Sequence, residues 1–216
     1  MSYPKKNPAP SRRRGDAPSN IYWHPAQAKQ EIRHACFGAR PATVWLTGLS
    51  GAGKSTIAYE LEQLLLRERH PCYVLDGDNL RHHLNRDLGF SAADRSENIR
   101  RAAEVAHLMN EAGLIVITAF ISPLRQDRDI AREIVLPERF VEVHVSTALA
   151  LCEERDPKGL YARARQGQIP EFTGISAPYE APLSPTLTLD TGAASLAHST
   201  RRVYQHLARH FFVEQP

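Results

Sequence analysis

The sequence has little cysteine and no long apolar run, and both shortages narrow the classes of protein it can encode. Its cysteines, Cys36, Cys72 and Cys152, are odd in number and far apart, so they form neither a disulfide framework nor a CxxC metal pattern. We expect buried free thiols in a reducing, cytoplasmic compartment. The most apolar stretch, residues 114–121, is far too short to span a membrane. The N-terminus has no apolar segment of the kind found in signal peptides, and we expect no membrane partner.

A strong excess of charge is also missing. The net charge is +3, which suits anionic small-molecule substrates but does not demand nucleic acid. Much of the excess lies in a proline-rich start that contains Lys5, Lys6 and the run 12–14. Such a run can be an anion-binding arm or a solvated tail. We predict that residues 1–19 are a disordered basic tail and that nucleic acid is not a partner.

The rest of the chain is predicted to fold as one domain over residues 20–216, because a chain of this length builds one hydrophobic core. Residues 20–41 show no clear pattern, and short apolar runs then alternate with helical patterns. Strands are predicted at 43–47, 72–76, 114–118, 140–145 and 186–190, and helices at 54–69, 93–112, 124–135, 147–154 and beyond 190. Ser91 and Asp94 are spaced like a capping box, and Gly113 is a plausible C-cap. This alternation predicts a three-layer α/β/α fold around a mainly parallel five-stranded sheet.

One segment breaks the alternation. Residues 155–185 carry several arginines, a lysine and five prolines without a clear period. A loop this long inside a compact domain is usually functional. We predict a mobile lid over an active site.

The first predicted strand and helix flank a phosphate-binding motif, G-x-x-x-x-G-K-[ST]. It comprises Gly48, Leu49, Ser50, Gly51, Ala52, Gly53, Lys54 and Ser55, followed by Thr56. Glycines let successive N–H groups point at phosphates, and the helix that follows adds the positive end of its dipole. The lysine is expected to neutralise the β- and γ-phosphates, and the serine hydroxyl to ligate Mg²⁺. The motif therefore predicts a P-loop fold that binds ATP and Mg²⁺.

A P-loop alone leaves several functions open, among them a small-molecule kinase, a GTPase switch and a motor ATPase. The chain has no Asn-Lys-x-Asp motif for guanine and is short for a motor module. A basic lid favours a small-molecule kinase, because phosphoryl transfer must be shielded from water.

A second group of polar residues follows the second predicted strand. Asp76, Gly77, Asp78 and Asn79 stand at its carboxyl end, where Mg²⁺ or an attacking hydroxyl is expected, although an Asp-Gly turn is also common there. Further candidates for this second site are Arg81, Phe90, Arg95 and Asn98; Ile121 and Ser122 after the third strand; and Lys158, Phe172 and Thr173 in the lid. Guanidinium groups on one helix face suit an anionic substrate.

Together these motifs resemble the adenylylsulfate kinase family. The resemblance runs through Asn20-Ile-x-Trp23-His24, Trp45–Thr56, Asp76–Asn79, Leu88–Ser91, Asp94–Arg101, Phe120–Pro123, Arg155–Tyr161, Phe172–Ile175 and Pro178–Pro182. It implies phosphorylation of the 3′-hydroxyl of adenosine 5′-phosphosulfate by ATP, in sulfate assimilation. A homodimer is expected.

The resemblance also implies roles for individual residues. Asp78 would orient or deprotonate the 3′-hydroxyl, and Asp76 would support the metal. Phe90 and Phe172 would sandwich the substrate adenine, while phosphosulfate and ribose would be held by Arg81, Arg95 and Asn98, with Ile121, Ser122 and Lys158 nearby. The family's phosphoserine position matches Ser122. In-line transfer between two bound nucleotides, however, needs positioning and charge neutralisation and not a covalent relay.

Two positions depart from the family pattern. His83 replaces a glycine, which a positive φ would resist, and Ser176 replaces an aspartate. Two other functions stay open: a different small-metabolite kinase, and a nucleotide sensor that binds ATP without transfer. Retention of Lys54, Ser55 and Asp78 argues against the sensor.

Overall fold

The computed structural model describes Tyr22 and residues 24–213. The basic tail predicted at 1–19 lies outside the described residues, as do Asn20, Ile21 and Trp23 of the family motif. Within the described part of the chain, no helix is both long and apolar enough to cross a membrane.

A five-stranded sheet forms the centre of the molecule. The strands are β1 (Thr43–Thr47), β2 (Cys72–Asp76), β3 (Ile115–Ala119), β4 (Phe140–Val145) and β5 (Leu187–Leu189). They lie in the order β2-β3-β1-β4-β5, and every neighbouring pair is parallel. The parallel sheet predicted from the continuous apolar runs is confirmed.

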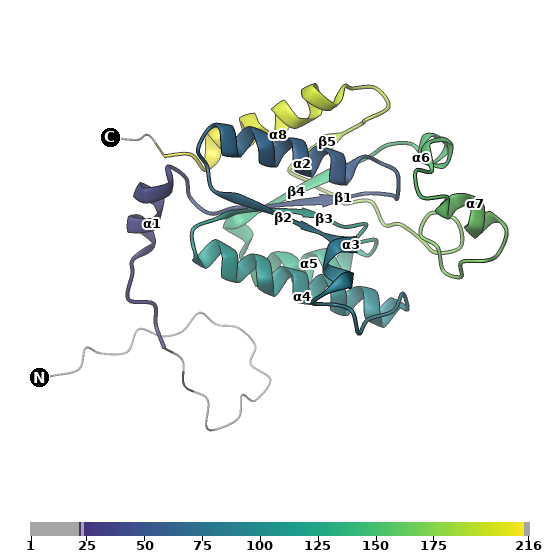
Figure 1. Ribbon diagram of the computed structural model, residues 1–216, viewed down its shortest axis with the longest axis horizontal. Coiled ribbons are helices and arrows are strands. Elements are labelled where there is room, and N and C mark those ends of the chain that lie inside the picture. The colour runs from purple at the N-terminus through teal and green to yellow at the C-terminus, as the bar shows by residue number, and fades with distance from the viewer. Residues whose placement is uncertain (1–21, 23, 214–216) are drawn as a thin grey trace, which may run out of the picture.

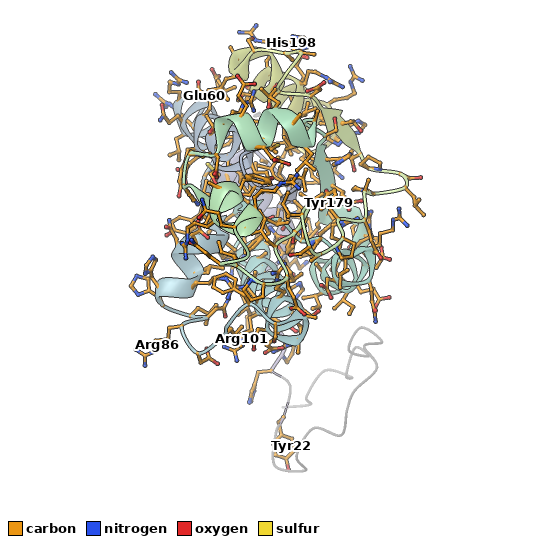
Figure 2. All side chains as sticks on the ribbon, turned by 90° about the vertical axis from the view of Figure 1, so that its right-hand side faces the viewer. Tyr22, Glu60, Arg86, Arg101, Tyr179 and His198 are labelled. Carbon is orange, nitrogen blue, oxygen red and sulfur yellow. The ribbon has the colours of Figure 1, made fainter. Side chains whose placement is uncertain are left out.

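Helices cover both faces of the sheet. They are α1 (Gln30–Phe37), α2 (Lys54–Arg67), α3 (Gly77–His82), α4 (Ala92–Glu111), α5 (Arg125–Val135), α6 (Leu149–Arg155), α7 (Leu160–Arg165) and α8 (Leu196–His210), with a 3₁₀ turn η1 (Pro137–Arg139). Figure 1 shows α2 and α8 above the sheet and α4 and α5 below it, while α6 and α7 lie beyond the carboxyl ends of the strands. Seen from that end, Tyr179 lies between the layer with Glu60 and His198 and the layer with Arg101 (Figure 2).

The central strand β1 is buried on both faces, which explains its unbroken apolar sequence. Val44 and Leu46 pack in the core beneath α2 and α8. Trp45 points to the other face and stacks on Phe120 and Phe140, with ring centroids 5.4 and 5.5 Å apart. Successive side chains of a strand point to opposite faces of the sheet. The burial of β1 on both faces therefore fixes the position of its carboxyl end and of the residues that follow it.

A buried asparagine joins the end of α4 to the sheet. Asn110 accepts a hydrogen bond from the Thr43 hydroxyl at 2.8 Å. Its amide donates to the carbonyls of Ala42 and Leu114 at 3.1 and 3.0 Å. The side chain is fully buried, so these contacts satisfy groups that water cannot reach.

The structure differs from the sequence prediction mainly in short helices. The helices α1, α3 and α7 were not predicted, and α7 lies inside the 155–185 segment, which is therefore not a plain loop. The predicted capping by Ser91 is confirmed, because its hydroxyl accepts from the Asp94 amide at 3.2 Å, while the Asp94 carboxylate accepts from that hydroxyl at 2.8 Å. All three thiols are free, but only Cys152 is fully buried; Cys36 is exposed, so its predicted burial was wrong.

Candidate active site

The phosphate-binding loop connects β1 to α2, as predicted. Gly48 has φ +153°, and a Cβ there would lie 2.4 Å from the Val145 carbonyl oxygen. No other residue fits this position without moving β4. Gly51 is also left-handed, with φ +73°. The glycines of the motif therefore serve both the turn and its close packing on the neighbouring strand.

Three side chains from later in the sequence hold this loop in place. The Ala52 carbonyl accepts hydrogen bonds from the hydroxyls of Thr147, at 3.1 Å, and Thr191, at 2.9 Å. The Tyr161 hydroxyl donates to the Ser50 carbonyl at 2.9 Å. Sequence reasoning missed these residues. Thr147 and Thr191 both lie just beyond a strand end, on the edge where the P-loop lies, and that position was a usable signal.

Lys54 begins α2 and is almost fully buried. Its ammonium group donates to the Leu49 carbonyl at 2.7 Å, across the turn of the loop. Burial disfavours the charged form and lowers the pKa of Lys54 to about 8, although Cys152 and Asp76 act in the opposite direction. A buried lysine aimed into a phosphate loop is a charge without a full set of partners, and an anionic ligand would supply them.

Ser55 and Asp76 meet between the two halves of the site. The Ser55 hydroxyl donates to one Asp76 oxygen at 2.7 Å, and the other oxygen accepts from the amides of Asp78 and Asn79. This pair offers hard oxygen ligands side by side, the type that Mg²⁺ prefers. The described residues contain no group of three or more His, Cys, Asp or Glu that could hold a metal. The pair fits Mg²⁺ because it offers two oxygen ligands, and Mg²⁺ completes its coordination with phosphates and water.

Asp78 lies in the first turn of α3, where Asp76 caps the helix. Its carboxylate pairs with the Lys158 ammonium group from the 155–185 segment, and both side chains are more than half exposed. Gly77 passes close to the Phe120 ring, and the Asn79 amide donates to the Tyr59 hydroxyl at 3.1 Å. The structure thus brings Asp78 and Lys158, far apart in sequence, into direct contact.

The arginines predicted for the second site lie together. Arg81 stacks over the Phe90 ring at 4.5 Å and donates to the Gly89 carbonyl at 2.7 Å. Burial lowers the pKa of Arg81, and the charge of Arg95 lowers it further. Arg95 itself donates to the Phe90 carbonyl at 2.8 Å and to the Thr173 hydroxyl at 2.7 Å. Two guanidinium groups that repel each other favour an anion between them.

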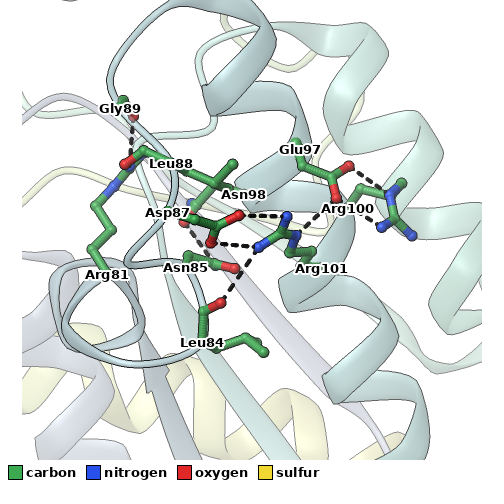
Figure 3. Close-up of polar contacts among 10 residues, drawn as sticks. All are labelled: Arg81, Leu84, Asn85, Asp87, Leu88, Gly89, Glu97, Asn98, Arg100 and Arg101. Carbon is green, nitrogen blue, oxygen red and sulfur yellow. Dashed lines mark hydrogen bonds and ion pairs between the residues drawn. The ribbon is translucent and has the colours of Figure 1, made fainter.

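Asn98 is buried and already has a partner. Its side-chain oxygen accepts from the Asn85 amide at 2.9 Å (Figure 3). Nearby on α4, Arg101 binds both oxygens of Asp87, at 2.8 and 2.9 Å, and the Glu97 carboxylate. These contacts hold the loop between α3 and α4, so Asn98 supports that loop, and its predicted contact with substrate stays a prediction.

The residues after β3 are tightly held. The Ile121 carbonyl accepts from the Thr47 hydroxyl at 2.7 Å, next to the P-loop. Ser122 is 2% exposed and has a left-handed φ of +39°. Its hydroxyl accepts from the Trp45 indole N–H at 3.2 Å. The Ser122 hydroxyl is thus engaged in the interior of the protein.

The aromatic residues of the second site have different surroundings. Phe90 is 67% exposed, whereas Phe172 is 8% exposed and contacts Tyr161 edge to face at 5.1 Å. The predicted adenine sandwich stays a prediction. Ser176 accepts from the Phe172 amide at 2.9 Å, so its hydroxyl supports the turn that carries Phe172. His83 has φ −127°, so the position does not have the positive φ that would favour glycine.

Comparisons with known proteins agree with this geometry. Residues 40–190 match the protein family described as adenylylsulphate kinase. An adenylyl-sulfate kinase from Shewanella sp. (strain ANA-3) is 55% identical over 189 residues, which cover 88% of this chain and 92% of the relative. The solved structure of the Mycobacterium tuberculosis APS kinase in complex with AMPPNP and APS is 49% identical. It aligns with a TM-score of 0.74, over 77% of this chain and 96% of that one.

A third similar protein is a hexamer. The hexameric APS kinase from Thiobacillus denitrificans is 32% identical, with a TM-score of 0.60. The match covers 80% of this chain and 29% of that one.

Proposed function

The chain belongs to the adenylylsulphate kinase family, and from this premise we propose that it transfers the γ-phosphoryl group of ATP to the 3′-hydroxyl of adenosine 5′-phosphosulfate. The products are 3′-phosphoadenosine 5′-phosphosulfate and ADP. One observation carries the proposal within this chain: the 2.7 Å hydrogen bond from Ser55 to Asp76 joins the phosphate loop to the turn that holds Asp78. An acceptor hydroxyl beside Asp78 would therefore lie at the phosphate end of ATP.

Asp78 is the residue we assign to the acceptor hydroxyl. Its carboxylate is exposed at the start of α3 and can accept the proton as the hydroxyl oxygen attacks. Its ion pair with Lys158 must open or shift when the substrate enters. Lys54 neutralises the charge on the transferred phosphoryl group, which supplies most of the catalysis in reactions of this type.

Mg²⁺ would be held by Ser55 and Asp76 and would neutralise the β- and γ-phosphate oxygens. The hydroxyl and the carboxylate lie 2.7 Å apart, with the Asp76 carboxylate anchored on the backbone of α3. The nucleotide phosphates would contact the backbone of the phosphate loop: Gly48, Leu49, Ser50, Gly51, Ala52, Gly53 and Thr56.

We assign the phosphosulfate group to Arg81 and Arg95, whose guanidinium groups donate to the Gly89 and Phe90 carbonyls and to the Thr173 hydroxyl. The remaining candidates for substrate contact are Gly77, Asn79, Phe90, Asn98, Ile121, Ser122, Lys158, Phe172 and Thr173. Ser122 is proposed to act through its position, because its buried hydroxyl is bound to Trp45.

The 155–185 segment is proposed to be the lid. It contributes Lys158 to Asp78 and Thr173 to Arg95, so both of its halves reach the second site. Closing over two bound nucleotides would exclude water, which otherwise competes with the acceptor hydroxyl.

Release of ADP, measured with each candidate acceptor in turn, tests the function. We expect ADP release with adenosine 5′-phosphosulfate and none above background with gluconate, shikimate or AMP. Lys54→Ala is the control and should lower turnover by orders of magnitude. Turnover with gluconate or shikimate alone would indicate a different small-metabolite kinase. Tight ATP binding without turnover on any acceptor would indicate a nucleotide sensor.

A cytoplasmic location and a homodimer belong to the same proposal. Free thiols are typical of a reducing compartment. Light scattering on the purified protein would give the stoichiometry, with a hexamer as the alternative outcome.

A further inference from the structure

The first turns of α5 contain a buried charge that the reaction does not use directly. Arg128 is 2% exposed, and its guanidinium group donates in three directions. Nε donates to the Glu142 carboxylate on β4 at 2.9 Å. Nη1 donates to the Ser122 carbonyl at 2.6 Å, and Nη2 to the Glu180 carbonyl at 2.7 Å. One side chain therefore joins a strand of the core, the end of β3 and the returning end of the 155–185 segment.

The segment is tied to the same place by further contacts. The Glu180 amide donates to the Pro123 carbonyl at 2.8 Å, and its carboxylate accepts from the Arg125 amide at 2.8 Å. The Arg125 side chain donates to the Ala181 carbonyl at 2.8 Å. Tyr179 bonds the Thr47 hydroxyl at 3.0 Å. Residues 179–181 are thus a fixed end from which the rest of the segment extends.

The backbone at Ser122 needs such support. Its φ of +39° is uncommon for a residue with a side chain. The carbonyl of this residue points at Arg128, so the guanidinium group holds the strained turn that carries Ile121 and Ser122 beside the second site.

The phosphate loop, by contrast, has its own supports. Thr147, Thr191 and Tyr161 bind its carbonyls, and these three contacts do not involve Arg128. Only the start of the loop touches the Ser122 turn, where the Gly48 amide donates to the Ile121 carbonyl at 3.4 Å and the Thr47 hydroxyl donates to the same carbonyl at 2.7 Å. Loss of the Arg128 fork should therefore disturb the second site more than the ATP site.

We propose that Arg128 is a positioning residue for the acceptor substrate, which holds the Ser122 turn and the fixed end of the 155–185 segment in the geometry that binds adenosine 5′-phosphosulfate. The proposal rests on the proposed function. A planar fork makes three directed contacts at once, which the single ammonium group of lysine cannot reproduce. Lysine does keep a positive charge beside Glu142, so that carboxylate is not left unpaired.

Arg128→Lys tests the proposal, and Arg132→Lys is the matched control. Arg132 binds the other oxygen of the same Glu142 at 2.9 Å, but among the described residues its hydrogen bonds do not reach Ser122 or Glu180. We expect Arg128→Lys to raise KM for adenosine 5′-phosphosulfate about tenfold and to change KM for ATP less than twofold. Arg132→Lys should change neither constant by more than twofold.

A purely structural role would give a different result. It would lower Tm in Arg128→Lys while both KM values stayed normal, or would raise both together, and either result overturns the proposal. If Arg128→Lys does not fold, Arg125→Ala decides, because Arg125 is exposed and supports the same fixed end. Arg125→Ala should raise KM for adenosine 5′-phosphosulfate about threefold and leave KM for ATP unchanged. An unchanged KM for adenosine 5′-phosphosulfate would overturn the proposal.

The two proposals fail in distinguishable ways. Absence of wild-type activity on adenosine 5′-phosphosulfate would remove the proposed function, whatever the variants do. Wild-type activity with no selective change in the variants would remove only the role of Arg128.

Discussion

Raising the pH should weaken ATP binding through a single group, Lys54. Burial lowers the pKa of Lys54 from the ordinary 10.5 to about 8 in the free protein. The lower pKa means that the charged form is disfavoured by about 3 kcal/mol, as the net result of burial and of the opposing charges around Lys54. Bound phosphates require the charged form. Above pH 8, nucleotide binding must therefore be accompanied by the uptake of a proton from solvent at Lys54.

The size of the effect follows from the fraction of Lys54 that is charged. Each pH unit above 8 reduces that fraction about tenfold, so the apparent affinity at pH 9.5 should be about 25-fold lower than at pH 7.5. The same shift acts on stability with the opposite sign. Between pH 8 and 10.5 the unfolded chain binds more protons at Lys54 than the folded protein does, so this residue's contribution to the free energy of unfolding rises with pH.

Titration calorimetry with AMPPNP and Mg²⁺ at pH 7.5, 8.5 and 9.5 measures the affinity directly. Repeating the pH 9.5 titration in buffers of different ionisation enthalpy should reveal close to one proton taken up per nucleotide bound. Lys54→Met is the control and should bind weakly, with no proton uptake. Lys54 does not control the pH dependence if the wild-type affinity for AMPPNP is constant from pH 7.5 to 9.5, or if it falls no more steeply than the affinity of Lys54→Met.

Three substitutions extend these expectations to other parts of the molecule. Asp78→Asn should lower kcat at least about 100-fold, the usual size of a lost general base, while the Kd for ATP changes less than threefold; equal losses in both would make Asp78 a binding residue. Gly48→Ala should abolish AMPPNP binding in calorimetry, because the added Cβ meets the Val145 carbonyl at 2.4 Å, and near-normal binding would contradict the loop geometry. Asn110→Ala removes three buried hydrogen bonds, including that from Thr43, and should lower the free energy of unfolding by about 3 kcal/mol in urea; a loss below about 1 kcal/mol would show that water replaces the amide.

The strands and the phosphate loop could be predicted because their signals are local. Each strand is a short apolar run, and the P-loop is a contiguous motif between a strand and a helix. Short helices were harder, because six residues carry no period. The helix α3 begins where Asp76–Gly77 suggested a turn, although the Asp76 carboxylate caps it. Likewise the Asp156 carboxylate accepts from the amides at 161 and 162 in the first turn of α7, although Gly159 is the N-cap residue of that helix. Only Asp76 was an N-cap signal in the sequence.

The contacts of the second site could not be read from the sequence, because they depend on how distant segments meet. Arg95 and Thr173 were both predicted as substrate residues, but their 2.7 Å hydrogen bond to each other arises only when the 155–185 segment folds over α4. Arg128 was not among the residues predicted for the site. Its three partners come from β3, β4 and the far end of that segment, and no spacing in the sequence relates them.

The two threonines that hold the Ala52 carbonyl have a consequence for synthesis of the protein. The phosphate loop is encoded near residue 50, but its supports at Thr147 and Thr191 are translated much later. A nascent chain that has displayed the whole Gly48–Ser55 motif still lacks both hydroxyls and the strands that carry them. Because domains complete their long-range contacts only when the whole unit is available, nucleotide binding should begin only after β5 has left the ribosome. ATP would then stabilise the finished kinase and not its partly synthesised forms.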